Sequence, residues 1–470
     1  MVTAIWWIRR DLRLYDNQAL HAALARAERL LPLFVLDPHL LEGPARSPRR
    51  NAFLLAALRS LDAELQRRGS ALTVVRGDPV TVVPELARAL RATVVAEEDA
   101  TPYAQRRDRS VGLRCPLLLV PGSTIRPLGS VRTPHGTAYR IYTQFVRAWR
   151  ALPQPSCEDL LPAPPVLPPP PAEIAGKLSL TETAEATRFE ASEAAARQRL
   201  ARFLSEGIAR YHESRNLLDG SGSSQLSPYF RFGLLSVREA YCRAAHARSV
   251  PEAAQGAQAW VGELLWREFY YHLLALHPEF ARTSMHPAFQ NRPWPGDLRH
   301  LAAWQQGETG YPVVDAAMRQ LVTEGWISNR ARMIVANFLT KLLLIDWRRG
   351  ERFFRQQLLD GDLAANAGGW QWSAGTGTDA APYFRIFNPV VQGQRYDPEG
   401  TWVRRWVPEL ADIPTDYLYA PWRMPPLVQQ AARCVIGQDY PAPIVDYATA
   451  RHRALAWFRL VLGRSDDGDT

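Results

Sequence analysis

The chain has 470 residues, enough for two or three domains, and its 47% hydrophobic and 22% charged residues are typical of a globular protein, not of a disordered or fibrous one. Its apolar runs are too short to span a membrane, and arginines follow the apolar run of MVTAIWWIRRDLRL, where a signal peptide places them before it. The net charge of +9 permits a polyanionic partner, and the four scattered cysteines indicate neither a zinc site nor a disulfide framework, which favours a reducing cytoplasm.

The first part of the chain alternates short apolar runs with amphipathic stretches. The runs TAIWWI, LLPLFVL, ALTVV, ATVVA and PLLLV predict buried strands, and residues 19–29, 49–67 and 80–91 predict helices between them. Strands that alternate with helices favour a parallel sheet with right-handed crossovers. We therefore predict a Rossmann-like α/β domain over residues 1–135.

A proline-rich segment separates this part from the rest. Residues 151–171 hold nine prolines in 21 positions, which is incompatible with a helix or a central strand, and we predict a linker over residues 136–190. Beyond it helical periodicity dominates, as over residues 329–347, and twelve of the 15 tryptophans follow residue 250. A large all-α domain is therefore predicted over residues 191–470.

In the helical part, YHESRNLLDGSGSSQLSPYFRFG places a Gly/Ser loop before a helix that is predicted to begin at Leu226 or Ser227. Backbone N–H groups at such a helix start, together with the hydroxyls of Ser223, Ser224 and Ser227, suit a phosphate group. The alternative is a flexible capped turn, which this segment by itself favours.

The segment WVGELLWREFYYH puts Trp260, Glu263 and Arg267 on one face of a predicted helix, with Trp266 beside them. An acid and a cation on an apolar helix are costly to bury unless they are paired. Their partner is either a bound group or, in the simpler interpretation, an ordinary salt bridge.

Two later segments carry further polar side chains. SNRARM sets several of them at the start of a short predicted helix, where Arg332 requires a carboxylate. The stretch DGDLAANAGGWQW offers Asp360 and Asp362 for that purpose. By itself this stretch is also compatible with a helix end that has Gly368 and Gly369 as caps and two core tryptophans.

Taken together, WREFY, TGYPVVDAAMRQL, SNRARM and DGDLAANAGGWQWSAGTGTDAAPYFRIFNP resemble the photolyase/cryptochrome flavoproteins, specifically the class I cyclobutane pyrimidine dimer photolyases. The likeness extends over nearly the whole chain, since IWWIRRDLRLYDNQAL is similar to their N-terminal strand and loop. Long motifs in the same order are far more specific than one short pattern. The resemblance implies a monomeric, FAD-dependent deoxyribodipyrimidine photo-lyase that acts on damaged DNA, without a metal or a membrane.

The resemblance also implies which residues bind FAD. Arg332 would pair with Asp360, Asp362 would contact the flavin ring or ribose, and Asn366 would lie against flavin N5. The full set at matching positions is Tyr211, Ser223, Ser224, Leu226, Ser227, Trp260, Arg267, Asn329, Arg332, Asp360, Asp362 and Asn366.

Roles in catalysis follow from the same resemblance. Trp370, Trp347 and Trp294 match the inner, middle and outer members of an electron-transfer chain, and Glu263 would hydrogen-bond the dimer. The other side chains that would contact the dimer or the DNA phosphates are Trp266, Trp372, Asn329, Met333, Arg215, Arg330 and Arg385.

A second, antenna chromophore is implied for the N-terminal domain. TPYAQRRD stands where folate-binding members have an asparagine–glutamate pair, so a deazaflavin or a flavin is expected, with Arg10, Arg50 and Asp99 as ligands. Gly262, where relatives often have a larger polar residue, is a further departure from the family pattern.

Two other functions stay open at this point. A cryptochrome-type blue-light receptor shares the fold without repairing DNA, although plant-type members have an acid where Asn366 stands. A DNA-binding or light-independent flavoprotein with a vestigial pocket is the other, and the presence of Glu263 and Trp266 argues against it. Members that repair (6-4) photoproducts have a histidine pair at Ser328 and Asn329, whereas no histidine lies here between His300 and His452.

Overall fold

A computed structural model of the chain describes residues 2–171 and 187–463. These residues form two compact units, and neither unit is continuous in sequence. The first unit comprises Met1–His212, Ser224–Pro278 and Leu359–Ala364, and the second comprises Glu213–Ser223, Glu279–Leu358 and Ala365–Thr470. Residues 172–186, part of the predicted linker, lie outside the described residues.

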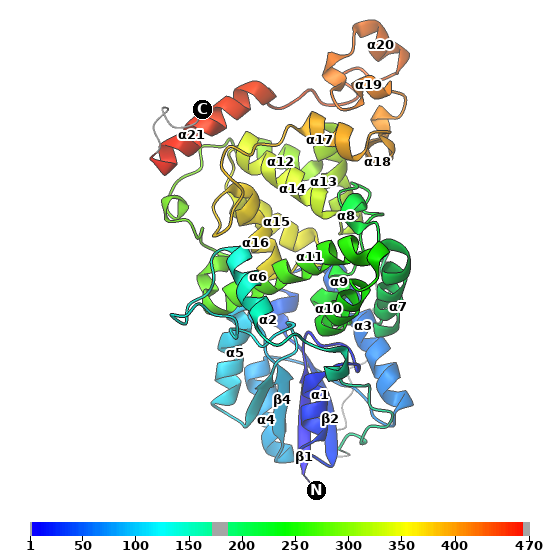
Figure 1. Cartoon of the computed structure of the whole chain (residues 1–470), viewed down its shortest axis with the longest axis vertical. Helices are drawn as coiled ribbons and strands as arrows, with labels where there is room; N and C mark the ends of the chain where they lie inside the picture. The colour runs from blue at the N-terminus through cyan, green and yellow to red at the C-terminus, as the bar shows by residue number, and fades with distance from the viewer. Residues whose placement is uncertain (1, 172–186, 464–470) are drawn as a thin grey trace. The chain divides into compact units, whose positions relative to one another are not determined.

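The first unit is built on a five-stranded parallel sheet with the order β3-β2-β1-β4-β5 (Figure 1). The strands are β1 (Thr3–Ile8), β2 (Arg29–Leu36), β3 (Thr73–Arg76), β4 (Thr93–Glu97) and β5 (Leu117–Val120). Every residue of β1 is buried, as expected for a central strand covered on both faces. The α/β prediction is confirmed, and each strand begins and ends within two residues of its predicted bounds.

Five helices of the first unit, α1 to α5, lie between the strands in sequence, and the other helices follow the last strand. The predicted helix over residues 19–29 ends early, at Leu24, because Arg29 already begins β2. The helix bounds are α1 Gln18–Leu24, α2 Pro38–Leu41, α3 Pro48–Arg67, α4 Pro79–Leu90, α5 Pro102–Gly112, α6 Tyr142–Ala151, α7 Glu193–Arg202, α9 Ser227–Phe232, α10 Val237–Ala247 and α11 Pro251–Leu276, with α8 (Tyr211–Ser214) where the two units divide.

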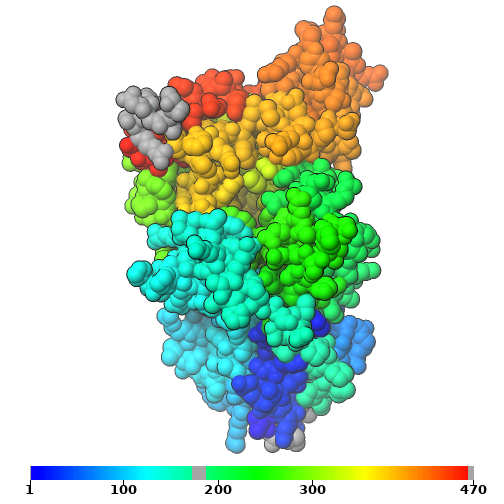
Figure 2. All heavy atoms as spheres, viewed as in Figure 1, coloured from blue at the N-terminus to red at the C-terminus, as the bar shows by residue number. Residues whose placement is uncertain are grey.

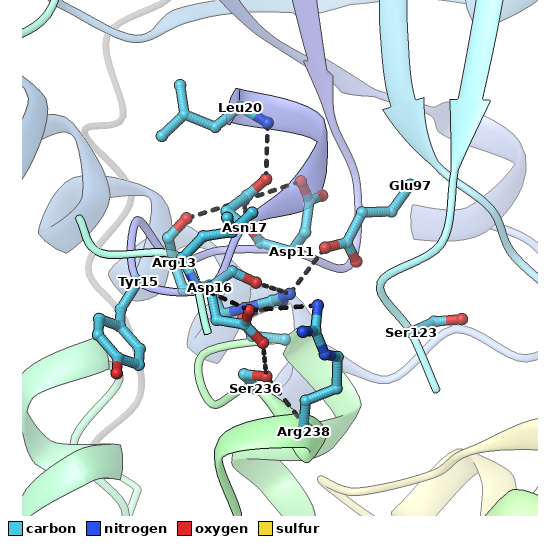
Figure 3. Close-up of polar contacts among 12 residues, drawn as sticks. Asp11, Arg13, Tyr15, Asp16, Asn17, Leu20, Glu97, Ser123, Ser236 and Arg238 are labelled. Carbon is cyan, nitrogen blue, oxygen red and sulfur yellow. Dashed lines mark hydrogen bonds and ion pairs between the residues drawn. The ribbon is translucent and has the colours of Figure 1, made fainter. Parts of the chain in front are cut away.

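A buried polar network follows β1 (Figure 3). Arg13 and Glu97 form an ion pair of 2.7 Å, and Asp16 accepts a hydrogen bond from Ser236, the residue that caps α10. Burial raises the pKa of Glu97 to about 8, although Arg13 opposes the shift. Since burying unpaired charges is costly, these contacts fix the strand end against the start of α10.

A disulfide links Cys157 to Cys242, and this corrects the expectation that the cysteines form none. Cys157 lies in the proline-rich segment and Cys242 in α10, at a sequence separation of 85 and with 5.4 Å between their Cα atoms. Such a pair has no local spacing pattern, so the sequence did not reveal it. Because the chain contains a disulfide, its cysteines no longer support a reducing cytoplasm.

Short helices and one large apolar core make up the second unit, and the space-filling view shows α17 to α20 as part of its surface (Figure 2). The helix bounds are α12 Arg299–Gln306, α13 Pro312–Glu324, α14 Asn329–Asn337, α15 Trp347–Gln357, α16 Leu363–Ala374, α17 Pro389–Tyr396, α18 Thr401–Trp406, α19 Thr415–Leu418, α20 Pro426–Ala431 and α21 Tyr447–Leu462, the first two residues of α16 belonging to the first unit.

The periodicity over residues 329–347 predicts continuous helix, and the structure breaks it. After α14 the chain passes through a π-helical turn, Phe338–Leu342, and Leu344 takes a left-handed conformation with φ of 52°. Asp346 then caps α15 by accepting from the backbone N–H of Arg348. The break is hidden in the sequence because the chain around it is buried on every side, so no polar face marks a helix end.

Lys341 is fully buried in the second unit. Its ammonium donates to the backbone carbonyl of Tyr383 at 3.3 Å and lies 3.7 Å from the ring centre of Phe458. Burial lowers the pKa of Lys341 to about 7. A cation in this apolar position destabilises the folded state while it remains protonated.

We therefore expect the free energy of unfolding to increase as the pH rises above about 7, because the unfolded chain then holds a proton that folded Lys341 has lost. Lys341→Met removes the buried amine and should stabilise the protein at pH 6 by about 2 kcal/mol. Urea unfolding of both proteins at pH 6 and pH 9 measures the effect. An equal pH slope in the two proteins would contradict it.

Candidate functional site

The predicted site residues are divided between the two units. The first unit contains Arg10, Arg50, Asp99, Tyr211, Ser224, Leu226, Ser227, Trp260, Glu263, Trp266, Arg267, Asp360 and Asp362. The second contains Arg215, Ser223, Trp294, Asn329, Arg330, Arg332, Met333, Trp347, Asn366, Trp370, Trp372 and Arg385.

The Gly/Ser segment leads into α9 as predicted, and its part in the first unit, from Ser224 onward, has buried Leu226 directly before the first helical residue, exposed Ser227. The indole N–H of Trp260, on α11, donates to the Ser224 hydroxyl at 3.3 Å. Tyr211 is buried and its ring meets that of Phe203 edge to face. The last serine of the predicted loop and the predicted tryptophan therefore lie in contact.

The helix α11 carries the predicted acid and cation. Arg267 donates to the carbonyl of Ser123 at 2.9 Å, and its guanidinium lies 4.1 Å from the ring centre of Tyr271. Glu263, one turn earlier, is partly exposed. Within the first unit, the Arg267 guanidinium thus contacts a backbone carbonyl and an aromatic ring. Its function as a phosphate ligand stays a prediction.

Tyr142 is a contact that the sequence did not suggest. Its ring stacks on Trp266 at 3.7 Å between ring centres, with 4° between the planes, and its hydroxyl donates to the Gly262 carbonyl at 2.9 Å. Together these contacts hold the turn of α11 that bears Glu263. Tyr142 begins α6 inside the predicted linker, where no motif marked it.

The acids of the opening loop of α16 differ in their surroundings. Asp362 accepts from Arg10 at 2.6 Å and from the Tyr271 hydroxyl, and Arg10 also lies 3.8 Å from Asp99. Asp360 is buried. Two of the expected antenna ligands therefore lie in one charge network with an acid expected at the flavin.

Arg50, the third expected antenna ligand, lies in the first turn of α3. Its guanidinium donates to the carbonyl of Ala45 at 2.5 Å. This contact keeps the side chain near the loop before α3.

In the second unit Asn366 is held in one orientation. Its amide N–H₂ donates to the backbone carbonyl and to the carboxylate of Glu351, both at 3.0 Å. Glu351 is buried, and burial raises its pKa. Because two acceptors face the nitrogen, the amide oxygen of Asn366 points the other way.

The accessible residues of α16 recur at helical spacing. Ala365 and Gly369 are exposed, and Asn366 and Trp372 are partly exposed. A methyl group added at Gly369 would meet no atom within 4 Å. The interpretation of the glycine pair as helix caps is wrong, since both glycines lie inside α16. A mid-helix glycine is unfavourable by about 1 kcal/mol relative to alanine. Glycine at position 369 is therefore best explained by a bound group that comes close to the backbone of α16.

Three tryptophans of the predicted electron-transfer chain share the core of the second unit. Trp370 and Trp347 are buried in one apolar cluster, and Trp294 packs against it. The indole N–H of Trp347 donates to Ser284 at 3.0 Å. A methyl group added to Gly350 would lie 2.1 Å from the Trp370 ring, so glycine is required there.

The side chains of the α14 start lie together as predicted. Asn329 donates to the Met333 sulfur at 3.7 Å, and Arg332 donates to the carbonyl of Ile327 at 3.1 Å. Arg330 donates to Asn216 at 2.8 Å, and its guanidinium lies 4.5 Å from the ring centre of Tyr396.

Positive charge gathers around Arg330. Burial lowers the pKa of Arg330, opposed by Tyr396, and the like charges of Arg215, Arg395 and Arg385 lower it further. Three of these arginines were predicted as phosphate contacts. Arg395 was missed, although a basic residue beside an aromatic one in QGQRYD was the available signal.

Among the residues that the structure describes, no group of three or more His, Cys, Asp or Glu side chains could hold a metal ion. In the same residues no helix is both long and apolar enough to cross a membrane.

Comparison with known proteins gives consistent matches. The family model for DNA photolyase matches residues 4–169, and the model for the FAD binding domain of DNA photolyase matches residues 260–460. A Thermus thermophilus protein named deoxyribodipyrimidine photo-lyase is 46% identical over 406 residues, which are 86% of this chain and 91% of that protein.

Two solved structures share the fold over nearly the whole chain. A class III photolyase from Agrobacterium tumefaciens has a TM-score of 0.90 and 34% identity, covering 98% of both chains. A cryptochrome from Synechocystis sp. PCC6803 has a TM-score of 0.89 and 30% identity, covering 97% of this chain and 99% of that one. The chain therefore belongs to the DNA photolyase family, and its helical part is that family's FAD-binding domain.

Proposed function

We propose that this chain repairs cyclobutane pyrimidine dimers in DNA by light-driven electron transfer. Reduced FAD, once bound, absorbs the light and supplies the electron that splits the dimer. The observation that carries the proposal is the order of side chains on α11, where Trp260 contacts the Ser224 loop and Glu263 and Trp266 follow within two turns. Those residues join a cofactor contact to a substrate contact on one rigid element.

The donor set fits FAD chemically. Guanidinium and hydroxyl groups suit a diphosphate, and the outward amide oxygen of Asn366 suits the polar edge of a flavin ring. The bare face at Gly369 leaves room for a planar ring to approach α16. The residues proposed to hold FAD are Tyr211, Ser223, Ser224, Leu226, Ser227, Trp260, Arg267, Asn329, Arg332, Asp360, Asp362 and Asn366.

The dimer would be bound by an apolar clasp with one polar edge. Trp266, fixed by its stack on Tyr142, would contact the cyclobutane ring, with Trp372 and Met333 as further apolar contacts. Glu263 would hydrogen-bond a carbonyl or imide group, and Asn329 would meet another carbonyl. Extracting the damaged pair from the duplex costs a few kcal/mol, less than for an intact pair.

The arginine cluster around Arg330 supports DNA as the partner. Three guanidinium groups disfavour the charge on a fourth, Arg330, and a polyanion, which releases counterions as it binds, would offset that repulsion. Phosphate contacts position the DNA without reading its sequence. A lesion-specific enzyme needs this combination of unspecific phosphate binding and a specific pocket.

Further features of the protein belong to the same proposal. It would work as a monomer in the cytoplasm, with the domain bounds predicted from sequence. A deazaflavin or flavin antenna near Arg10, Arg50 and Asp99 would collect light for the FAD. Since Arg10 bonds Asp362, these two functions would share one charge network.

Purified protein with reduced FAD, assayed on oligonucleotides that carry one defined lesion, tests the proposal. We expect light-dependent loss of cyclobutane dimers and none in the dark. Binding of FAD without any repair of this substrate would overturn the proposal in favour of a cryptochrome-type receptor. Failure of the folded protein to take up FAD would overturn it in favour of a light-independent DNA-binding protein.

Gly369→Leu should abolish FAD binding while the protein stays folded. The leucine side chain would occupy the bare face of α16. It should not destabilise the helix, because leucine is a better helix former than glycine by roughly 1 kcal/mol. Flavin absorbance per protein after purification measures the loss, and Ala456→Leu on the exposed side of α21 is the matched control. Full FAD content in Gly369→Leu would show that the ring lies elsewhere.

A further inference from the structure

Trp294, the outer tryptophan of the predicted chain, has an aromatic neighbour that no motif marked. Its ring centre lies 4.8 Å from that of Trp457 on α21, with 41° between the planes. Phe458 meets both indoles edge on, at 6.3 Å from Trp294 and 4.8 Å from Trp457. The two tryptophans therefore form a pair inside one aromatic cluster.

The pair lies at the accessible end of the tryptophan series. Trp370 and Trp347 are buried, whereas Trp294 and Trp457 are both partly exposed. The indole nitrogen of Trp294 is nevertheless inaccessible to solvent and has no hydrogen-bond partner among the described residues. Trp294 can thus lose an electron, but it has no acceptor at hand for its N–H proton.

A contrasting neighbour lies at the inner end. Trp304 is 6.0 Å from Trp370 between ring centres and is completely buried, and its N–H donates to the Val335 carbonyl at 3.0 Å. An electron vacancy that moved to Trp304 would lie in the core, out of reach of solvent. A vacancy that moved to Trp294 would instead reach a partly exposed indole.

We propose that Trp457 is the terminal electron donor of the tryptophan chain, a role that rests on the proposed light-driven function and extends it by one residue. Trp294, oxidised by one electron to its radical cation, would take one electron from Trp457 and return to its closed-shell state. Trp457 would then release its N–H proton to water and become a neutral radical. A thiol in solution would return one electron and one proton to it.

The chemistry favours this direction. Because the Trp294 nitrogen has neither water nor an acceptor, its radical cation keeps its proton and stays oxidising. Loss of a proton at the partly exposed Trp457 traps the vacancy there, away from the buried members of the chain. A surface-reaching donor also gives a thiol access that the buried indoles lack.

Peptide mass spectrometry of FAD-loaded protein, illuminated in air without a thiol, locates the residue where the vacancy ends. We expect light-dependent oxygen addition chiefly at Trp457, and at Trp294 in Trp457→Phe. With a thiol present, the tryptophan radical absorbance should decay several-fold more slowly in Trp457→Phe than in the unsubstituted protein. Trp406→Phe, another partly exposed tryptophan of the second unit, should change neither result.

Two outcomes would overturn the inference. Oxidation at Trp294 in the unsubstituted protein, with Trp457 unmodified and the thiol reaction unchanged in Trp457→Phe, would make Trp294 the terminal donor. Absence of light-dependent oxidation at every tryptophan would remove the chain itself. Neither outcome touches the repair assay, which starts from FAD that is already reduced, so failure of the proposed function is detected separately.

Discussion

Glu263→Ala is expected to lose most of its light-dependent repair of cyclobutane dimers while it still binds damaged DNA. A hydrogen bond aimed at the group that gains charge during the reaction typically contributes about a hundredfold to a thousandfold in rate. Binding relies in addition on the arginine cluster and the apolar clasp, so it should weaken much less. Repair per absorbed photon and dissociation constants for the same oligonucleotide separate the two effects.

Glu263→Gln is the matched control because it keeps the length and a hydrogen-bond donor. It should retain more repair than Glu263→Ala. Equal losses of repair and of binding in both variants would show that Glu263 holds the DNA and has no special part in the reaction.

The choice of lesion follows from the same pocket. Repair of a (6-4) photoproduct needs a proton donor at the lesion, and the segment from Ser328 onward contains no histidine before His452. Asn329 and Met333 offer an amide and a thioether instead. Repair of a (6-4) substrate by the reduced protein would contradict this assignment.

The sequence predicted the sheet well because each strand is a short apolar run bounded by turn residues. The same reasoning failed at Leu344, where a buried left-handed residue ends a helical stretch without any polar mark. The Cys157–Cys242 disulfide was missed for a related reason, since it joins segments that no local pattern connects. Local periodicity reports burial, and it does not report where a uniformly buried chain turns.

The site residues were predictable as a set, through their resemblance to a family, but not in their contacts. Asn366 was named from its motif, whereas the buried Glu351 that orients it lies 15 residues away on another helix. Tyr142 stacks on Trp266 from a segment that the sequence marked only as linker. Groups that position catalytic residues leave weak signals because any side chain of suitable shape can serve.

Trp347→Phe should lose nearly all light-driven reduction of oxidised FAD and keep repair by protein that already holds reduced FAD. Trp347 is buried in the same apolar cluster as Trp370 and Trp294, and phenylalanine is much harder to oxidise than tryptophan. The substitution also removes the bond to Ser284 and some packing, which should cost about 1–3 kcal/mol of stability.

Trp304→Phe controls for that cost, because Trp304 is equally buried, also loses one hydrogen bond and also lies in the core beside Trp370. Both variants should unfold at similarly lower urea concentrations, and only Trp347→Phe should lose photoreduction. Flavin absorbance during illumination with a thiol measures reduction, and the dimer assay after chemical reduction measures repair. Equal loss of photoreduction in the two variants would mean that packing around Trp370 matters and that Trp347 carries no electron.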